Sequence, residues 1–176
     1  MAIYQIDPVH SSVSFSVKHM MIAKIHGAFE KVSGKLIFDK ANPEKSSAEA
    51  TIEAASINTR EPQRDTHLRS PDFFDVDKFP SLTFKSKAVA ASSVGELQVT
   101  GDLTIKGVTK QVTLAVEGPS EELKDPYGNL KIGLSASTKI KRKEFGLTWN
   151  AALETGGVLV GDDVTIALDL QFVKQT

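Results

Sequence analysis

The chain has 176 residues, of which 40% are hydrophobic and 24% are charged. This composition predicts one globular domain over residues 1–176 and argues against a disordered tail protein or a collagen-like chain. With 21 basic and 22 acidic residues, the formal net charge is -1, so the sequence has no basic surplus with which to bind nucleic acid.

Cysteine is absent, which removes disulfides, thiolate metal sites and cysteine nucleophiles from consideration. Residues 1–8 include Asp7 and Pro8 where a signal peptide would have a basic start and an apolar core. We therefore expect a cytoplasmic protein. No apolar run approaches the roughly 20 residues that are needed to cross a bilayer, so we expect no stable membrane insertion.

Apolar and polar residues alternate with period two along most of the chain, which places one set of side chains on each face of a strand. Near the N-terminus, for example, Val13, Phe15 and Val17 alternate with Ser14 and Ser16. The same alternation predicts strands, in chain order, at 13–17, 36–38, 48–54, 82–84, 97–105, 112–116, 130–136 and 164–172.

The segments between these strands are less regular. Residues 19–27 show no clear alternation and no helix caps, so we expect a loop or a short helix there. One α-helix is expected, with Asn58 or Thr59 as its cap, Pro62 in its first turn and Arg69 as its last residue, just before Ser70 and a proline. Turns are expected at 106–107, 125–129 and 161–163, where glycine, asparagine or proline is found.

Many short strands, one helix and no βαβ rhythm favour an all-β sandwich or an antiparallel barrel. Several inward positions carry small residues, namely Ala48, Ala50, Ala54, Gly101 and Ala136. Small residues would leave room inside an up-and-down barrel of about eight strands. Large residues elsewhere could instead fill the interior, so the alternation alone leaves an open and a filled barrel equally possible; these large residues are Phe15, Phe84, Trp149 and Phe172.

The four histidines are the candidate metal ligands, but none forms a His-x-His or His-x-x-x-His pair. We predict structural hydrogen bonding for them and no metal site. Asp65, His67 and Ser70 are the residue types of a hydrolytic triad, but they are too close along one helix to meet in the required geometry. We therefore predict no catalytic residue. Asp65 and Arg69, spaced i,i+4, are expected to pair on the helix surface while His67 faces inward or onto a rim.

Positive charge is concentrated on the expected helix, at Arg60, Arg64, His67 and Arg69. Guanidinium groups bind phosphate oxygens in bidentate fashion, so this set is a candidate site for the head of a phosphorylated lipid. The alternative, which the local sequence favours, is a solvated helix face whose charge is balanced by nearby acidic residues.

Specific motifs occur from one end of the chain to the other. They are IDPVHS at 6–11, RDTHLRSPDFFDV at 64–76, GDLTIKGVT at 101–109, RKEFGL at 142–147 and VGDDV at 160–164. On these residues the chain resembles the YceI-like family of lipocalin-like barrels that bind polyisoprenoids. It departs from the family pattern at Tyr4, where tryptophan is usual, and at Glu144, where aspartate is commoner.

The resemblance implies an antiparallel lipocalin-like β-barrel with one short α-helix, which decides against the sandwich. It further implies an elongated apolar tunnel that holds a polyisoprenoid or other long-chain lipid, with no cofactor beyond that ligand. A homodimer is compatible with the resemblance. Relatives occur both exported and in the cytoplasm, so a periplasmic location stays open if a leader precedes this sequence.

Inward parity and the resemblance together predict the ligand contacts. The expected tunnel residues are Val13, Phe15, Val17, Ile52, Phe84, Val99, Leu134, Trp149 and Phe172. The candidate headgroup contacts are His19, Arg64, His67 and Arg69.

We predict a non-enzymatic protein that binds, transports or stores a long-chain isoprenoid, such as a quinone-type or polyprenyl-phosphate molecule. Two alternatives stay open. The first is an enzyme acting on a lipophilic isoprenoid-type substrate in the same cavity, with His19, His67 or Asp65 as acid–base groups. The second is a filled barrel that acts as a structural or interaction module.

Overall fold

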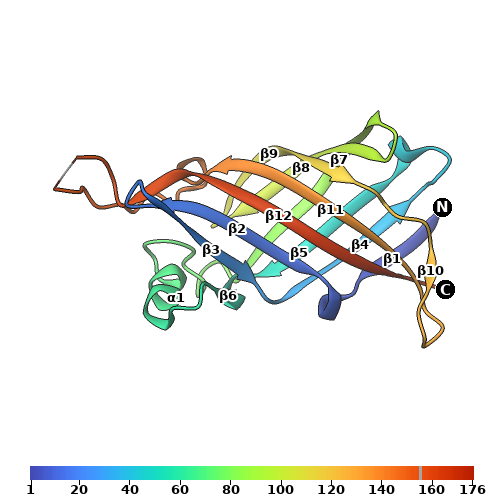
Figure 1. The fold of residues 1–176 in the computed structure, drawn as a ribbon, viewed down its shortest axis with the longest axis horizontal. Coiled ribbons are helices and arrows are strands. Elements are labelled where there is room, and N and C mark those ends of the chain that lie inside the picture. Colours follow the sequence, from blue (N-terminus) through green and yellow to red (C-terminus); the bar gives the residue numbers. More distant parts are fainter. Residues whose placement is uncertain (155) are drawn as a thin grey trace.

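The structure, a computed structural model, describes residues 1–154 and 156–176. Its centre is a closed antiparallel barrel, which confirms the all-β, lipocalin-like prediction of about eight strands (Figure 1). The strands follow the order β1, β4, β5, β7, β8, β9, β11, β12, and β12 pairs with β1 to close the ring. Their bounds are β1 Ala2–Ile6, β4 Val32–Phe38, β5 Ser47–Glu53, β7 Ser81–Ser93, β8 Glu96–Ile105, β9 Val108–Glu117, β11 Leu130–Lys141 and β12 Val160–Lys174.

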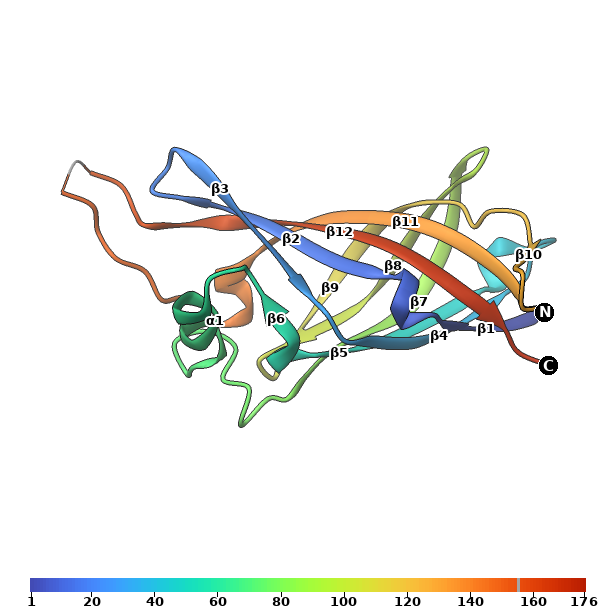
Figure 2. The same cartoon turned by 60° about the horizontal axis from the view of Figure 1, so that its bottom comes forward.

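Three strands extend the sheet at one end of the barrel. β2 (Ser12–His19) pairs with residues 160–169 of β12, β3 (Ala23–Phe29) pairs with β2, and β6 (Ile57–Asn58) pairs with β3. The helix α1 (Pro62–Arg69) lies at this end, and both termini lie at the other (Figures 1 and 2). The remaining elements are β10 Leu123–Lys124 and the 3-10 helices η1 Pro8–His10, η2 Pro43–Lys45, η3 Ala54–Ser56 and η4 Arg142–Phe145.

The strands expected from alternation are all present, and most are longer than expected. The expectation of a loop or short helix at 19–27 is wrong, because this segment forms the turn and most of the second strand of the β2–β3 hairpin. The inward positions of β3 are Ile25, Gly27 and Phe29, and the ring of Phe15 lies against Gly27. A glycine that makes room for an aromatic ring from the neighbouring strand interrupts the apolar pattern that would have revealed the strand.

The expected turns are partly confirmed. Lys106 and Gly107 both have positive φ, 51° and 74°, in the tight β8–β9 hairpin. The turn expected at 161–163 is wrong: β12 already begins at Val160, and residues 161–163 lie where its register with β2 shifts, as in a β-bulge. Ala54, expected in a strand, instead begins η3 and is fully buried.

The helix at 62–69 is confirmed, but its cap is neither Asn58 nor Thr59. The side chain of Glu61 caps it by accepting a hydrogen bond of 3.1 Å from the amide of Gln63. Thr59 is instead buried, and its hydroxyl donates a hydrogen bond to the carboxylate of Asp65. Across the described part of the chain, the helices are all too short or too polar to cross a bilayer.

The expected surface pair between Asp65 and Arg69 is also wrong. Asp65 is buried. Its Oδ1 accepts two hydrogen bonds from Thr59, one from the backbone amide at 2.9 Å and one from the side-chain hydroxyl at 2.5 Å. Arg69 donates to the carbonyl oxygens of Ala55 at 3.0 Å and Ile57 at 3.1 Å. The chain entering the helix leaves polar backbone groups near the core, and both side chains satisfy these groups rather than each other.

A network at the end opposite α1 joins β1 to β11. Lys131 donates to Asp7 Oδ2 over 2.9 Å, and His10 Nδ1 lies 2.8 Å from the same oxygen. The hydrogen bond from Lys131 lowers the pKa of Asp7 to about 2, from an ordinary value of 3.8. Because the folded-state pKa is depressed, Asp7 stabilises the fold above its ordinary pKa, and this contribution is lost as the pH falls toward 2.

Replacing Asp7 with Asn is therefore expected to lower the free energy of unfolding by about 1–2 kcal/mol at pH 7. The difference from the wild type should shrink from about pH 4 downward. Urea unfolding at several pH values measures it. Asp102→Asn is the control, because it breaks a surface ion pair with Lys87 at 3.4 Å. It should lower the free energy of unfolding by less than about 0.5 kcal/mol. A difference for Asp7→Asn that persists unchanged at low pH would contradict the assignment.

Candidate functional site

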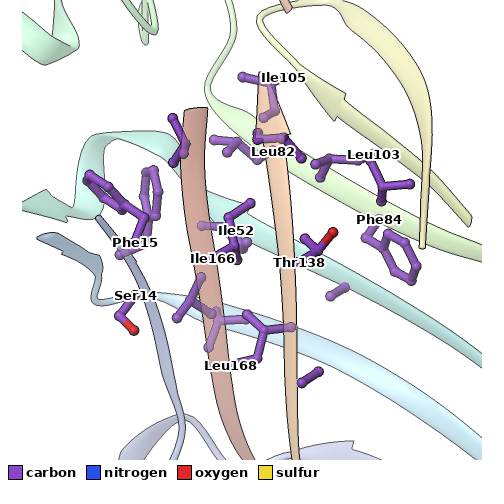
Figure 3. A pocket seen from close by; sticks show the side chains of 18 of the residues that line it. Ser14, Phe15, Ile52, Leu82, Phe84, Leu103, Ile105, Thr138, Ile166 and Leu168 are labelled. Carbon is purple, nitrogen blue, oxygen red and sulfur yellow. The ribbon is translucent and has the colours of Figure 1, made fainter. Parts of the chain in front are cut away.

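The barrel encloses a cavity of about 530 Å³, within the range of 300–1,000 Å³ that is usual for small-molecule sites. Most of its wall is built from residues of the barrel strands and β2, and the rest comes from β3, α1 and the connections at the ends of the barrel. The interior is therefore open rather than filled. Figure 3 shows part of this wall, including Phe15, Ile52, Leu82, Phe84, Leu103, Ile105, Ile166 and Leu168.

Two of the large aromatic residues, Phe84 and Phe15, leave room in the cavity because they lie against glycines. A Cβ atom added to Gly101 would stand 2.6 Å from Cζ of Phe84, and one added to Gly27 would stand 2.9 Å from Cε1 of Phe15. Each ring therefore occupies the place of a missing side chain on a neighbouring strand. Ala50, between Gly34 and Phe84 on the adjacent strands, adds a third small position to the wall.

All nine residues predicted for the tunnel belong to the wall of this cavity. Ligand contact at these positions stays a prediction, but the structure brings them together around one space. They are Val13, Phe15, Val17, Ile52, Phe84, Val99, Leu134, Trp149 and Phe172.

The candidate headgroup residues divide into two groups. His19, Arg64 and His67 lie in the cavity wall, together with Gln63, and we call these four residues the polar rim. Arg69 is not part of the wall, because its guanidinium is held by the two backbone carbonyls described above. The structure thus brings three of the four predicted headgroup residues to one end of the cavity.

Arg64 is fixed at the rim by Thr59. Its Nε donates to the hydroxyl of Thr59 over 2.7 Å, and its Nη2 donates to the carbonyl of Thr59 over 2.7 Å. That hydroxyl in turn donates to Asp65. Within the described residues Nη1 of Arg64 has no hydrogen-bond acceptor, so this side chain keeps donors for a group that enters the cavity.

His67 belongs to an aromatic cluster at the same end. Its ring stands perpendicular to Trp149, at 86° and 4.7 Å between centroids, and edge-on to Phe73 at 5.1 Å. Its Nε2 lies 2.8 Å from Oδ2 of Asp72. Ser70 donates its hydroxyl to the carbonyl oxygen of His67 rather than to the ring. The arrangement of Asp65, His67 and Ser70 is therefore not that of a catalytic triad.

The sequence interpretation missed Arg142, which also belongs to the cavity wall. It is only 3% exposed, and burial lowers the pKa of its guanidinium. It stands first in the RKEFGL motif, but the sequence interpretation gave it no role, because an arginine followed by Lys143 and Glu144 is typical of an exposed turn. Among the described residues, no cluster of three or more histidine or acidic side chains suited to a metal ion is found.

Comparisons with known proteins agree with this geometry. A family model described as the YceI-like domain matches residues 4–172. A UPF0312 protein of Staphylococcus aureus strain USA300 is 40% identical over 169 residues, which is 96% of each chain.

Solved structures show the same fold. The crystal structure of Burkholderia cenocepacia BcnA has a TM-score of 0.80 at 30% identity and covers 94% of this chain and 98% of its own. The Campylobacter jejuni YCEI protein has a TM-score of 0.76 at 33% identity, with 90% of each chain covered. A polyisoprenoid binding domain from Saccharophagus degradans, implicated in plant cell wall breakdown, has a TM-score of 0.71 at 18% identity and covers 99% of this chain and 100% of its own.

Proposed function

Because the chain belongs to the YceI-like family, we propose that it binds a long-chain isoprenoid or a similar amphiphilic lipid inside the barrel and carries or stores it unchanged. The observation that carries the proposal is the apolar cavity of about 530 Å³ with the polar rim at one end. A similarly folded structure is described as a polyisoprenoid binding domain, which supports the same ligand class.

Burial of hydrocarbon supplies the affinity. Each methylene moved from water into an apolar site contributes about 0.8 kcal/mol, so a dozen buried carbons contribute roughly 10 kcal/mol before the costs of association. Such a wall discriminates by length and cross-section more than by chemical detail. Selection between charged and uncharged ligands then depends on the polar rim.

Native mass spectrometry of the freshly purified protein, followed by organic extraction, tests the proposal. We expect a long-chain isoprenoid or fatty amphiphile near one equivalent per chain, chemically unchanged after extraction. The same spectrum reports the oligomeric state. If the mass stays that of the bare chain after incubation with polyprenyl and fatty ligands, the proposal is wrong. If an added ligand is returned as a different compound, the protein is an enzyme instead.

We further propose that the head of the ligand lies at the polar rim, with Arg64 as its charged contact. Arg64→Gln is expected to weaken binding of a polyprenyl phosphate about tenfold or more, since a hydrogen bond to a charged group contributes about 1.5–3 kcal/mol. Binding of the uncharged polyprenol of equal length should change little. Titration of both ligands measures the two effects.

Arg69→Gln is the matched control, because Arg69 lies on the same helix but outside the cavity wall. It should lower stability through its lost backbone contacts while leaving both affinities unchanged. Equal losses for the phosphate and the alcohol in Arg64→Gln would show that Arg64 only supports the wall.

A further inference from the structure

The turn between β2 and β3 exposes three consecutive apolar side chains. Met20 is 45% exposed, Met21 is 60% exposed and Ile22 is 84% exposed, and we call these residues the apolar tip. The tip lies at the end of the barrel that carries α1, opposite both termini (Figures 1 and 2). Contiguous exposed apolar residues usually mark a surface that contacts another molecule.

The backbone of the tip is unfavourable for these residues. Met20 has a φ of 53° and Met21 a φ of 62°, so both are in the left-handed region, in the turn between His19 and Ala23. Asparagine and glycine are strongly preferred there, because a bulky side chain is strained at positive φ. Two methionines in these positions thus weaken the hairpin locally, and strain of this kind is typical of functional positions.

The hairpin below the tip is basic. Lys18 and Lys24 stand directly opposite each other on β2 and β3, and neither forms an ion pair within the described residues. Like charges in this position are destabilising unless a partner neutralises them. Residues 8–29 contain no aspartate or glutamate. At the neighbouring start of β12, Asp163 is already paired with Lys141 over 3.0 Å.

The tip is continuous with the cavity. Val17, Lys18 and His19, which precede it along β2, belong to the cavity wall. The amide of Met20 donates to the carbonyl of Leu159, another wall residue, over 2.8 Å. A surface bound at the tip would therefore lie beside the polar rim.

We propose that the apolar tip docks the protein on an anionic lipid bilayer, with its side chains among the acyl chains and the two lysines at the headgroups. An apolar group flanked by basic residues is what a peripheral contact with such a surface requires. Two other exposed apolar residues, Val94 and Leu123, each have a glutamate nearby. Val94 lies two residues before Glu96, and Leu123 stands between Glu122 and Lys124. The docking does not depend on what the cavity binds.

Cosedimentation with vesicles of phosphatidylcholine, with and without phosphatidylglycerol, tests the proposal. The double variant Met20→Asn/Met21→Gly relieves the strain at positive φ but also removes the contact of the Met21 side chain with Gly157, so its free energy of unfolding should lie within about 1 kcal/mol of that of the wild type. We expect it to lose about tenfold or more in partition to vesicles containing phosphatidylglycerol, because two apolar side chains no longer enter the bilayer. Val94→Ser, at a hairpin turn on the opposite end, is the control and should bind as the wild type does.

A second variant tests the contribution of the two lysines. Lys18→Gln/Lys24→Gln should weaken binding to vesicles with phosphatidylglycerol and change little with phosphatidylcholine alone. The proposal is overturned if wild-type protein does not cosediment, or if Met20→Asn/Met21→Gly binds equally well. It is also overturned if that variant converts a dimer to a monomer without changing vesicle binding, because the tip would then contact a second copy. Extraction of the same variants reports cavity ligands separately, so failure of the docking is distinguishable from failure of the proposed function.

Discussion

Replacing Ala50 with tryptophan is expected to weaken binding of long isoprenoids about 100-fold while leaving the barrel folded. Ala50 lies in the cavity wall on β5, paired with Gly34 on one side and Phe84 on the other. An indole at this position would project into open space and divide the cavity. Excluding about four methylenes removes roughly 3 kcal/mol of binding free energy, which is about 100-fold in affinity. Native mass spectrometry with ligands of increasing length measures the loss.

The loss should grow with chain length, because a short ligand can still occupy the part of the cavity that remains. Because the side chain enters empty space, the free energy of unfolding should change by less than about 1.5 kcal/mol. Ala90→Trp is the matched control, since Ala90 is exposed on the outer face of β7. Undiminished binding of a long isoprenoid by Ala50→Trp would show that the ligand is held somewhere other than this cavity.

Period-two alternation predicted the strands well because each barrel strand has one face against the interior. β1, a barrel strand of 5 residues, was not predicted. The other failures occurred where that reason does not apply. β3 was missed because Gly27 stands at an inward position to accommodate Phe15. β6 has only two residues, too few for any periodicity. The barrel itself followed from the resemblance, since alternation alone is equally compatible with a sandwich.

The strand residues in the wall of the cavity were predictable from the alternation of the sequence, because every second residue of a barrel strand faces inward. The residues at the α1 end of the cavity were harder to predict, because they come from α1 and from connections. The side chains of these segments do not alternate between inward and outward directions. Arg64 and Arg69 both lie on α1, and only the path of the chain around residues 55–59 decides that Arg69 is held by backbone carbonyls. Pairing by i,i+4 spacing failed for Asp65 because it is buried against Thr59.

Arg142 is the clearest residue whose role the sequence patterns could not identify, and its replacement is expected to have the largest effect on stability. Its guanidinium donates to the carbonyls of Leu147 at 2.6 Å, Trp149 at 2.9 Å, Gly161 at 2.7 Å and Val160 at 3.1 Å. These acceptors lie on both sides of the connection between η4 and β12. One side chain therefore holds both ends of that connection beside the cavity.

Arg142→Ala would leave the carbonyl oxygens of Leu147, Trp149 and Gly161 without the guanidinium as donor, whereas that of Val160 keeps the side-chain amide of Asn150. We expect a loss of about 3–5 kcal/mol in the free energy of unfolding, measured by urea denaturation. Lysine carries the charge but lacks the planar fork of donors, so Arg142→Lys should recover only part of the loss.

Lys143→Ala provides the control, because this neighbouring side chain is exposed and its replacement should cost less than about 0.5 kcal/mol. Hydrogen exchange separates a local effect from a global one: in Arg142→Ala the amides of Leu147, Leu159 and Val160 should lose protection before those of β8 and β9. A stability within about 1 kcal/mol of the wild type would mean that water replaces the guanidinium at these carbonyls. The connection would then be held by its own contacts, such as the hydrogen bonds of the Asn150 side chain to Val160.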